Sequence, residues 1–387
     1  MNKKNYLNSI NNSQKPFIIY KTIKGFDLFT DFSKKIILNN QNIKHFLNQN
    51  HSSKKKYKST DLYVGFFGYE LLNNLIGIKV PRQKSINFPK GIFYKPETKI
   101  NLKEDLIYES QSTHKIDRNF KINIDQNSYT KIFDKFKKKI RSGQTYQIKI
   151  CTKYKNKSQI DPLDFFCRLA KTNLAPEAFM IKDKNYSIIS CSPENLINKK
   201  GSSISTKPIA GTLRKTKKIN KKKALNFFKN NIKETKEHNM IVDMERNDLS
   251  RICIPGTVRL KKEKSVEEYK DLYHYVSLIS GKLKEKVKNI DIIKAMMPGG
   301  SVIGCPKIST LNLLNNQEKE NRNIYTGSFG FIKFNGDMRF NIIIRSLLNY
   351  KNFSEISVAS GVVIDSNANQ EFNENFIKAK ALIDLFK

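Results

Sequence analysis

The sequence predicts an α+β protein, in which antiparallel strands are grouped in pairs and helices lie between the groups. Three observations support this prediction. Apolar segments of strand length occur as neighbours along the chain. One such pair is separated by Asn335 and Gly336, a dipeptide that strongly indicates a two-residue hairpin. The regular alternation of strands and helices that is typical of a doubly wound parallel sheet is absent.

The pattern of the chain changes near residue 60. Residues 1–60 are a short, divergent region with a surface stretch rich in lysine and asparagine. Residues 61–78 read instead as a strand or tight turn followed by a short helix. We therefore expect the main domain to span residues 61–387.

In the first half of this domain, the elements follow from local signals. Residues 127–142 have helical periodicity and end before Gly143, a residue suited to a helix C-terminus. Residues 145–155 alternate as a strand does. Asp161 caps the helix that follows, and residues 179–197 are predicted as a hairpin.

The second half is predicted in the same way. After Pro208 we expect a lysine-rich connector, and then a helix in the KETKEHNMIV segment. A later helix is stopped by Pro298. Residues 354–365 are apolar enough to form a strand, and the last helix begins near Asn369.

Composition excludes several classes of protein. The chain has 387 residues and 39% hydrophobic residues, enough for a sizeable core. No apolar run is long enough for a membrane span, and the polar N-terminus lacks the apolar stretch of a secretory signal. The cysteines are scattered and show no CxxC spacing, so we expect neither a zinc site nor a disulfide framework, and a cytoplasmic location.

The net charge of +36 raises the possibility of a basic RNA-binding protein. The lysines are spread along the whole chain, however, and no aromatic and basic module for RNA is present. The general excess of lysine, asparagine and isoleucine fits compositional drift on a solvated surface. A positive field would still attract an anionic substrate.

Two pairs of glutamates carry the strongest chemical signal. Glu234 and Glu237 are three residues apart on one predicted helix, and Glu371 and Glu374 are three apart on another. This spacing places both carboxylates of a pair on one helix face. One such pair alone would more often be a solvated helix face. Two faces brought together would offer four carboxylates to a hard divalent cation, most plausibly Mg²⁺.

The order of the other motifs gives these pairs a context. Along the chain stand GQTYQI, SPE, KPIAGT, KEHNMIVDMERNDLSR, YHYVS, PGGSVIGCPK, IYTGSFGF, DMRFNIIIRSLL, ASGVVIDS and QEFNENFIKAK. Together they resemble the chorismate-utilising enzymes, which include anthranilate synthase component I, aminodeoxychorismate synthase component I, isochorismate synthase and salicylate synthase. The resemblance covers residues 61–387. It implies an anthranilate synthase component I-like fold, with two antiparallel sheets packed face to face and helices outside.

The resemblance also implies a role for each matching residue. Glu237 and Glu374 match the Mg²⁺ ligands, with Glu234 and Glu371 beside them. Glu194 matches a general acid that protonates a departing hydroxyl group. His274 matches a histidine that contacts the substrate near that group.

The substrate-binding residues follow in the same way. Tyr325 and Arg345 match residues that bind a second carboxylate, a task that suits the planar fork of arginine. Lys378, one turn beyond Glu374, matches another carboxylate-binding residue. Thr212, Ser301 and Gly361 match positions that line the site with hydroxyl and backbone groups.

Gln147 bears on which nucleophile the enzyme uses. Family members that add water carry a lysine at this position, and that lysine can act as a base. A glutamine amide has no useful basicity near neutral pH. Ammonia needs no such base, so Gln147 favours amination of chorismate over isochorismate or salicylate synthesis.

Two amination products remain open. Ala210 in PIAGT resembles anthranilate synthases, because many aminodeoxychorismate synthases have a lysine there. The segments TNLAPEAFMIKD and VGFFGYELLNNLIGIKVPRQKSINFPKGIFYKP instead resemble aminodeoxychorismate synthase. We expect formation of 4-amino-4-deoxychorismate, with anthranilate as the alternative. No cysteine lies in a glutaminase-like motif, so a separate glutamine amidotransferase subunit is expected to supply ammonia.

Overall fold

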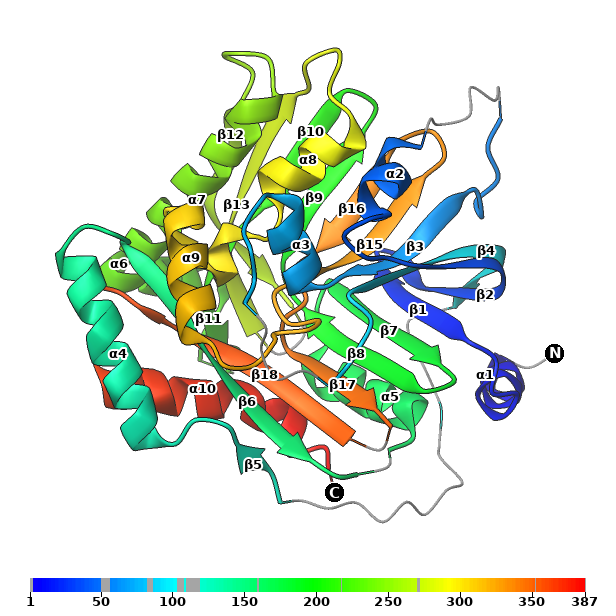
Figure 1. Ribbon diagram of the computed structural model, residues 1–387, viewed down its shortest axis with the longest axis horizontal. Coiled ribbons are helices and arrows are strands. Elements are labelled where there is room, and N and C mark those ends of the chain that lie inside the picture. Colours follow the sequence, from blue (N-terminus) through cyan, green and yellow to red (C-terminus); the bar gives the residue numbers. More distant parts are fainter. Residues whose placement is uncertain are drawn as a thin grey trace.

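The α+β class expected from the sequence is confirmed by a computed structural model of the chain (Figure 1). The structure describes residues 3–49, 56–81, 86–102, 108, 119–158, 160–216, 218–269, 272–351 and 353–386. The helices of this part are α1 (Lys3–Asn12), α2 (Ile43–Asn48), α3 (Tyr69–Leu75), α4 (Gln126–Arg141), α5 (Pro162–Asn173), α6 (Lys221–Asn230), α7 (Ile232–Ile252), α8 (Asn289–Met296), α9 (Lys307–Gln317) and α10 (Ala368–Ile383), with a 3₁₀ turn η1 at Gly300–Val302.

The strands of the described residues pair antiparallel throughout. They are β1 (Phe17–Thr22), β2 (Gly25–Ile37), β3 (Leu62–Phe67), β4 (Gly91–Leu102), β5 (Lys121–Ile122), β6 (Gln147–Asn156), β7 (Glu177–Asp183), β8 (Tyr186–Ser192), β9 (Asn195–Lys200), β10 (Ser203–Lys207), β11 (Ile209–Arg214), β12 (Arg259–Glu268), β13 (Leu272–Lys282), β14 (Gly304–Cys305), β15 (Ser328–Lys333), β16 (Met338–Asn341), β17 (Ser346–Tyr350) and β18 (Phe353–Val362).

Hydrogen bonds join these strands into one long curved strip. Starting from β6, neighbours follow in the order β18, β17, β8, β7, β1, β2, β4, β3, β15, β16, β9, β10 and β13. β11 and β12 both pair with β13 at the far end. The two sheet regions expected from the sequence are therefore connected through their strands.

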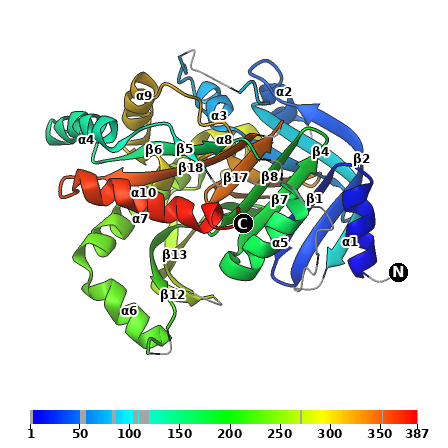
Figure 2. The same cartoon turned by 90° about the horizontal axis from the view of Figure 1, so that it is seen from below.

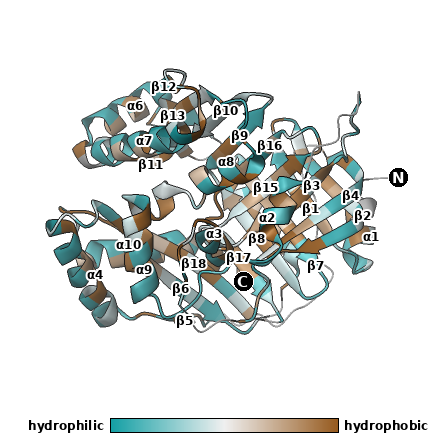
Figure 3. Cartoon of the chain, turned by 45° about the horizontal axis from the view of Figure 1, so that its top comes forward, coloured by the Kyte–Doolittle hydropathy of each residue, from teal (hydrophilic) through white to brown (hydrophobic). Residues whose placement is uncertain are grey.

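The two ends of the strip carry different helices. At one end α10 packs on β18 and α4, and Figure 2 shows α10 lying along β18. At the other end α7 packs on β11 and β13. Figure 3 shows these two ends facing each other, with polar residues on the outer helix surfaces. Segments more than 100 residues apart in the sequence thus become opposite walls.

Aromatic and aliphatic side chains fill the interior between sheet and helices. A large buried cluster lies beneath α2, α3, α8 and α9, and a second one lies beneath α5 and α10. In a third buried cluster, the rings of Phe179 on β7 and Phe329 on β15 stack with their centroids 3.8 Å apart. Such close packing of strands from distant segments makes the frame rigid.

Most local predictions are confirmed. α4 ends before Gly143, whose φ of +73° suits a residue without a side chain. The β15–β16 hairpin turns at Asn335 and Gly336, where the glycine has a φ of +85°. Asp161 caps α5 by accepting hydrogen bonds from two backbone amides.

Two local predictions are wrong. The segment after Pro208 was expected to begin a connector, but residues 209–214 form β11, which pairs with β13. The lysine-rich connector contains α6, in which Ala224 and Phe228 are buried against β12 and β13. Tertiary packing of these few apolar residues outweighs a composition that indicates a loop.

The boundary at residue 60 stays a prediction. In the structure, β1 pairs with β7 and β2 pairs with β4, so residues 17–37 belong to the same hydrogen-bonded strip. The described helices include none that is long and apolar enough to cross a membrane.

Candidate active site

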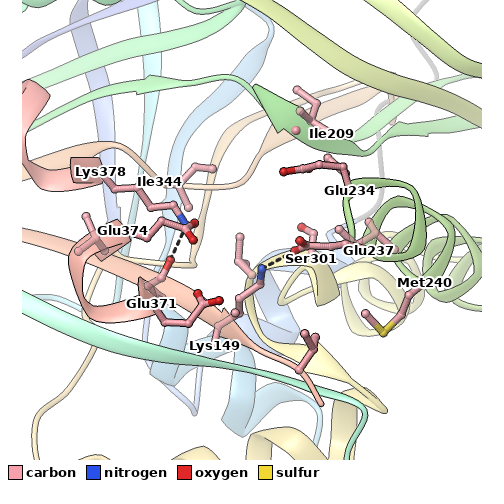
Figure 4. Close-up of a pocket in the computed structure, with 18 of the residues that line it drawn as sticks. Lys149, Ile209, Glu234, Glu237, Met240, Ser301, Ile344, Glu371, Glu374 and Lys378 are labelled. Atoms are coloured by element: carbon pink, nitrogen blue, oxygen red, sulfur yellow. Dashed lines mark hydrogen bonds and ion pairs between the residues drawn. The ribbon is translucent and has the colours of Figure 1, made fainter. Parts of the chain in front are cut away.

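A cavity of about 1060 Å³ lies between the two ends of the strip (Figure 4). Its walls come from α7, β11 and β13 on one side and from α10, β6 and β18 on the other. The cavity brings together most of the residues that the sequence analysis selected: Glu194, Glu234, Glu237, His274, Ser301, Tyr325, Arg345, Gly361, Glu371, Glu374 and Lys378.

Each glutamate pair begins in the first turn of its helix. In α7 the side chain of Asn231 accepts a hydrogen bond from the Glu234 amide, which fixes the start of the helix. In α10 Asn367 caps the helix in the same manner, with Glu371 in the first turn. The positive ends of both helices therefore favour the carboxylates that face the cavity.

Glu237 is held from the opposite wall. Its Oε1 atom accepts hydrogen bonds from Lys149 Nζ at 2.8 Å and from Gln147 Nε2 at 2.9 Å. Both donors belong to β6, so this contact spans the cavity. The ammonium group of Lys149 is the main reason that the pKa of Glu237 falls to about 2.

The other glutamate pair is held locally. Glu371 accepts a hydrogen bond from Ser366 Oγ at 3.1 Å. Glu374 forms an ion pair with Lys378, one turn further along α10, at 2.6 Å. Lys378 also donates to the carbonyl oxygen of Ala359 at 3.0 Å, which directs its side chain toward β18.

The donor chemistry of the four carboxylates fits a hard divalent cation such as Mg²⁺. Among the described residues, no three acidic, histidine or cysteine side chains converge closely enough to bind one ion. Glu237, Glu371 and Glu374 instead have the protein partners named above. Binding of Mg²⁺ by Glu234, Glu237, Glu371 and Glu374 would therefore require some of these partners to be exchanged.

Glu194 lies between β8 and β9, where the SPE motif connects the two strands. It is 4% exposed and faces the cavity beside Ser301. Burial raises the pKa of Glu194 to about 7, although Ser301 and Lys149 oppose the shift. A carboxyl group with this pKa can hold a proton near neutral pH and give it to a leaving group.

His274 lies in β13 and is buried in the cavity wall. Burial, assisted by the positive charge of Arg345, lowers the pKa of His274 to about 3. The imidazole is therefore neutral at physiological pH and suits hydrogen bonding rather than charge pairing. Arg345 lies directly before β17 in a left-handed conformation with a φ of +49°. Tyr325 lines the cavity in a small buried cluster with Cys151 of β6 and Ala359 of β18.

The remaining predicted residues differ in how directly they face the cavity. Ser301 in η1 and Gly361 in β18 line it. Gln147 is 1% exposed and donates to Glu237 from β6, so it contacts a cavity residue but is not itself part of the lining. The backbone of Thr212 pairs with that of His274, while its side chain lies outside the described part of the chain.

The structure adds one residue that the sequence analysis did not select. Lys149 lines the cavity and contacts Glu237. The sequence contained a signal for it, because Lys149 is two residues from Gln147 in a predicted strand and so shares its face. The partner across the cavity was not predictable from that pattern.

Sequence comparison decides the family. The profile of the chorismate binding enzymes matches residues 3–384. The chain belongs to this family. Aminodeoxychorismate synthase component 1 of Bacillus subtilis (strain 168) is 35% identical over 258 residues, which are 66% of this chain and 55% of that protein. Anthranilate synthase component 1 of Saccharolobus solfataricus is 30% identical over 332 residues, with 82% and 79% covered.

Solved structures of similar fold agree with this membership. Anthranilate synthase component I from Streptococcus pneumoniae TIGR4 has a TM-score of 0.76 and 25% identity, covering 95% of this chain and 92% of that one. The putative isochorismate synthase DhbC from Bacillus anthracis has a TM-score of 0.73 at 18% identity and shares the fold, covering 98% of each chain. The chain thus belongs to the chorismate binding enzyme family, and its match spans little more than half of its Bacillus subtilis relative.

Proposed function

We propose that this chain catalyses the Mg²⁺-dependent amination of chorismate to 4-amino-4-deoxychorismate, with ammonia from a separate glutamine amidotransferase subunit. The observation that carries the proposal is the cavity itself, where two glutamate pairs, a buried acid and several basic side chains line one space. The family membership supports chorismate as the substrate.

The charges of the cavity suit a dicarboxylate. Arg345, which lies near His274, and Lys378 on α10 provide separate anchors for two carboxylates, and Tyr325 also lines the cavity. We assign the enolpyruvyl carboxylate to Arg345 and Tyr325, because both match the family residues for that carboxylate and both line the cavity. The ring carboxylate would then face the two glutamate pairs, where a bound Mg²⁺ would neutralise its charge and polarise the ring.

Glu194 is assigned as the general acid. Its raised pKa leaves a substantial fraction protonated near neutral pH, and it lines the same cavity as His274. In this role it gives its proton to the hydroxyl group that leaves the ring, while neutral His274 donates or accepts a hydrogen bond nearby. Ser301 and the backbone at Gly361 complete the polar lining, and Thr212 is retained as a substrate-binding residue by its match to the family motif.

Gln147 supports ammonia rather than water as the nucleophile. Its amide donates to Glu237 and has no basic group with which to activate water. The same argument disfavours isochorismate and salicylate as products.

Anthranilate remains the second candidate product. Ala210 lines the cavity wall at the position where many aminodeoxychorismate synthases carry a lysine. In addition, the relatives include proteins named anthranilate synthase component 1. The preference for 4-amino-4-deoxychorismate rests on the segments around residues 64–96 and 172–183, which resemble aminodeoxychorismate synthase.

A cytoplasmic location and the folate pathway follow as parts of the same proposal. No glutaminase motif is present in the sequence, which supports a partner subunit that hydrolyses glutamine. We favour an enzyme over a basic RNA-binding protein because the family match covers residues 3–384.

The proposal is tested with purified protein, chorismate, MgCl₂ and an ammonium salt, without a partner subunit. We expect chorismate to disappear in the presence of Mg²⁺ and to persist when EDTA is added. Coupled detection of pyruvate separates the products, because anthranilate formation releases pyruvate and aminodeoxychorismate formation does not. Chorismate that persists under all these conditions would refute the assignment.

A further inference from the structure

We propose that the ammonium group of Lys149 occupies part of the metal site. It binds the Glu237 carboxylate when no metal is bound, and it competes with Mg²⁺ for that carboxylate. The inference rests on the proposed function, since it assigns the glutamate pairs to Mg²⁺. It adds a residue of this chain that controls how tightly the site takes up the metal.

The first support is the path of the Lys149 side chain. Lys149 pairs with Gly361 in the register between β6 and β18. A methyl group on Gly361 would lie only 2.7 Å from Lys149 Nζ and 3.3 Å from its Cδ. The side chain therefore passes over the glycine into the cavity, and Figure 4 shows it reaching from the wall of Glu371 toward Glu237.

The second support is the oxygen atom that Lys149 binds. Oε1 of Glu237 accepts from both Lys149 and Gln147, so two donors saturate the atom. A metal ion needs a lone pair of the ligand atom that binds it. Coordination through Oε1 therefore requires one of the two donors to move away, and Lys149 is the one that carries a positive charge.

The third support is the electrostatic setting. The side chain of Lys149 is 12% exposed, and a nearly buried ammonium is stable only with a close anionic partner. Glu237 is that partner, at 2.8 Å, and the Lys149 ammonium also interacts electrostatically with Glu374 and Glu371. The ammonium thus lies within the field of both glutamate walls, where a divalent cation would be repelled by it.

A covalent role for Lys149, in place of the lysine absent at Ala210, is a different use of the same side chain. A nucleophilic amine needs a free lone pair, whereas the Lys149 ammonium donates to a carboxylate. The geometry therefore favours charge competition over covalent attack.

The test measures binding of Mg²⁺ alone by isothermal titration calorimetry, in protein freed of metal with EDTA and without chorismate. We expect Lys149→Met to bind Mg²⁺ at least about tenfold more tightly than the wild-type protein, because a charge within a few ångströms of the ion is removed. Lys149→Arg keeps the charge and should not bind more tightly. Lys149→Gln, which keeps a hydrogen-bond donor, replaces the methionine variant if that variant does not fold.

Lys155→Met is the matched control. Lys155 lies on the same strand and forms an ion pair with Glu320, outside the cavity lining, so its loss should leave Mg²⁺ affinity unchanged. Suppose that the wild type binds Mg²⁺ and consumes chorismate, and that Lys149→Met binds Mg²⁺ no more tightly than the wild type. That result would overturn the inference and leave the proposed function intact. If neither protein binds Mg²⁺ and chorismate is not consumed, the proposed function itself fails.

Discussion

The two glutamate pairs have the same spacing in the sequence but different surroundings in the structure. Glu374 on α10 pairs with Lys378 on its own helix, and both side chains are about two-fifths exposed. Glu237 on α7 pairs with Lys149 from the opposite wall, and these side chains are 26% and 12% exposed. One carboxylate is thus held by a local, solvated contact and the other by a long-range, largely buried one.

The two ion pairs therefore differ in how easily they break and in which parts of the fold they connect. The local pair on α10 can open at little cost, because exposed ion pairs are weak. The pair across the cavity connects α7 with β6, and so links the two ends of the sheet strip. Variants of the two walls should therefore agree in catalysis and differ in stability.

The largest effect is expected for the metal ligands. Glu237→Gln and Glu374→Gln should each reduce Mg²⁺-dependent turnover of chorismate by at least about a hundredfold, because each removes a charged ligand from the site. Steady-state rates over a range of Mg²⁺ concentrations measure this effect. An active Glu374→Gln enzyme with unchanged Mg²⁺ dependence would contradict the assignment of α10 as the second metal wall.

The Glu194→Gln variant tests whether Glu194 is the general acid. We expect turnover to fall by about a hundredfold or more, the range for loss of a general acid. The sign of the pH dependence follows from its pKa, which burial raises to about 7. The protonated acid predominates below that pH, so wild-type turnover should decline as the pH rises through about 7. If the Glu194→Gln variant still shows this decline, the pH dependence comes from another group.

Stability should distinguish the two ion pairs directly. Glu237→Gln leaves the Lys149 ammonium without its carboxylate, and we expect a loss of about 2 kcal/mol in the free energy of unfolding, discounted for partial exposure. Glu374→Gln should cost less than about 1 kcal/mol. Urea denaturation in EDTA measures both values. Equal losses would show that the cavity-spanning pair does not stabilise the fold.

The smallest effect is expected for Lys378→Met. The variant loses an exposed ion pair within one helix, so the free energy of unfolding should change by about 0.5 kcal/mol or less. Its effect on the Michaelis constant for chorismate should be larger, since we assign Lys378 to a substrate carboxylate. Thermal melts and steady-state kinetics of the same preparation compare the two. An unchanged Michaelis constant would remove Lys378 from the binding site.

The parts of this protein that were predictable from the sequence are those governed by local physics. The cap at Asp161, the stop at Gly143 and the turn at Gly336 each depend on a few neighbouring residues. Helix periodicity likewise placed both carboxylates of each pair on one face, and α7 and α10 contain them as expected. The motif order then indicated that the pairs share one site.

The contacts that cross the cavity were not predictable in this way. The pairing of Lys149 with Glu237 depends on the register of β6 against β18 and on the space that Gly361 leaves free. α6 was missed for a related reason, because its few apolar residues gain stability from strands far along the chain. Both features arise from tertiary packing, which local patterns do not encode.

Mass spectrometry of the product formed from chorismate, Mg²⁺ and ¹⁵N-labelled ammonium tests the central claim most directly. We predict a product that keeps the enolpyruvyl group and carries one ¹⁵N atom at C4 of the ring, which is 4-amino-4-deoxychorismate. Labelled anthranilate, with release of pyruvate, would retain the amination but contradict the predicted product. A hydroxylated product without ¹⁵N would contradict the account of the nucleophile.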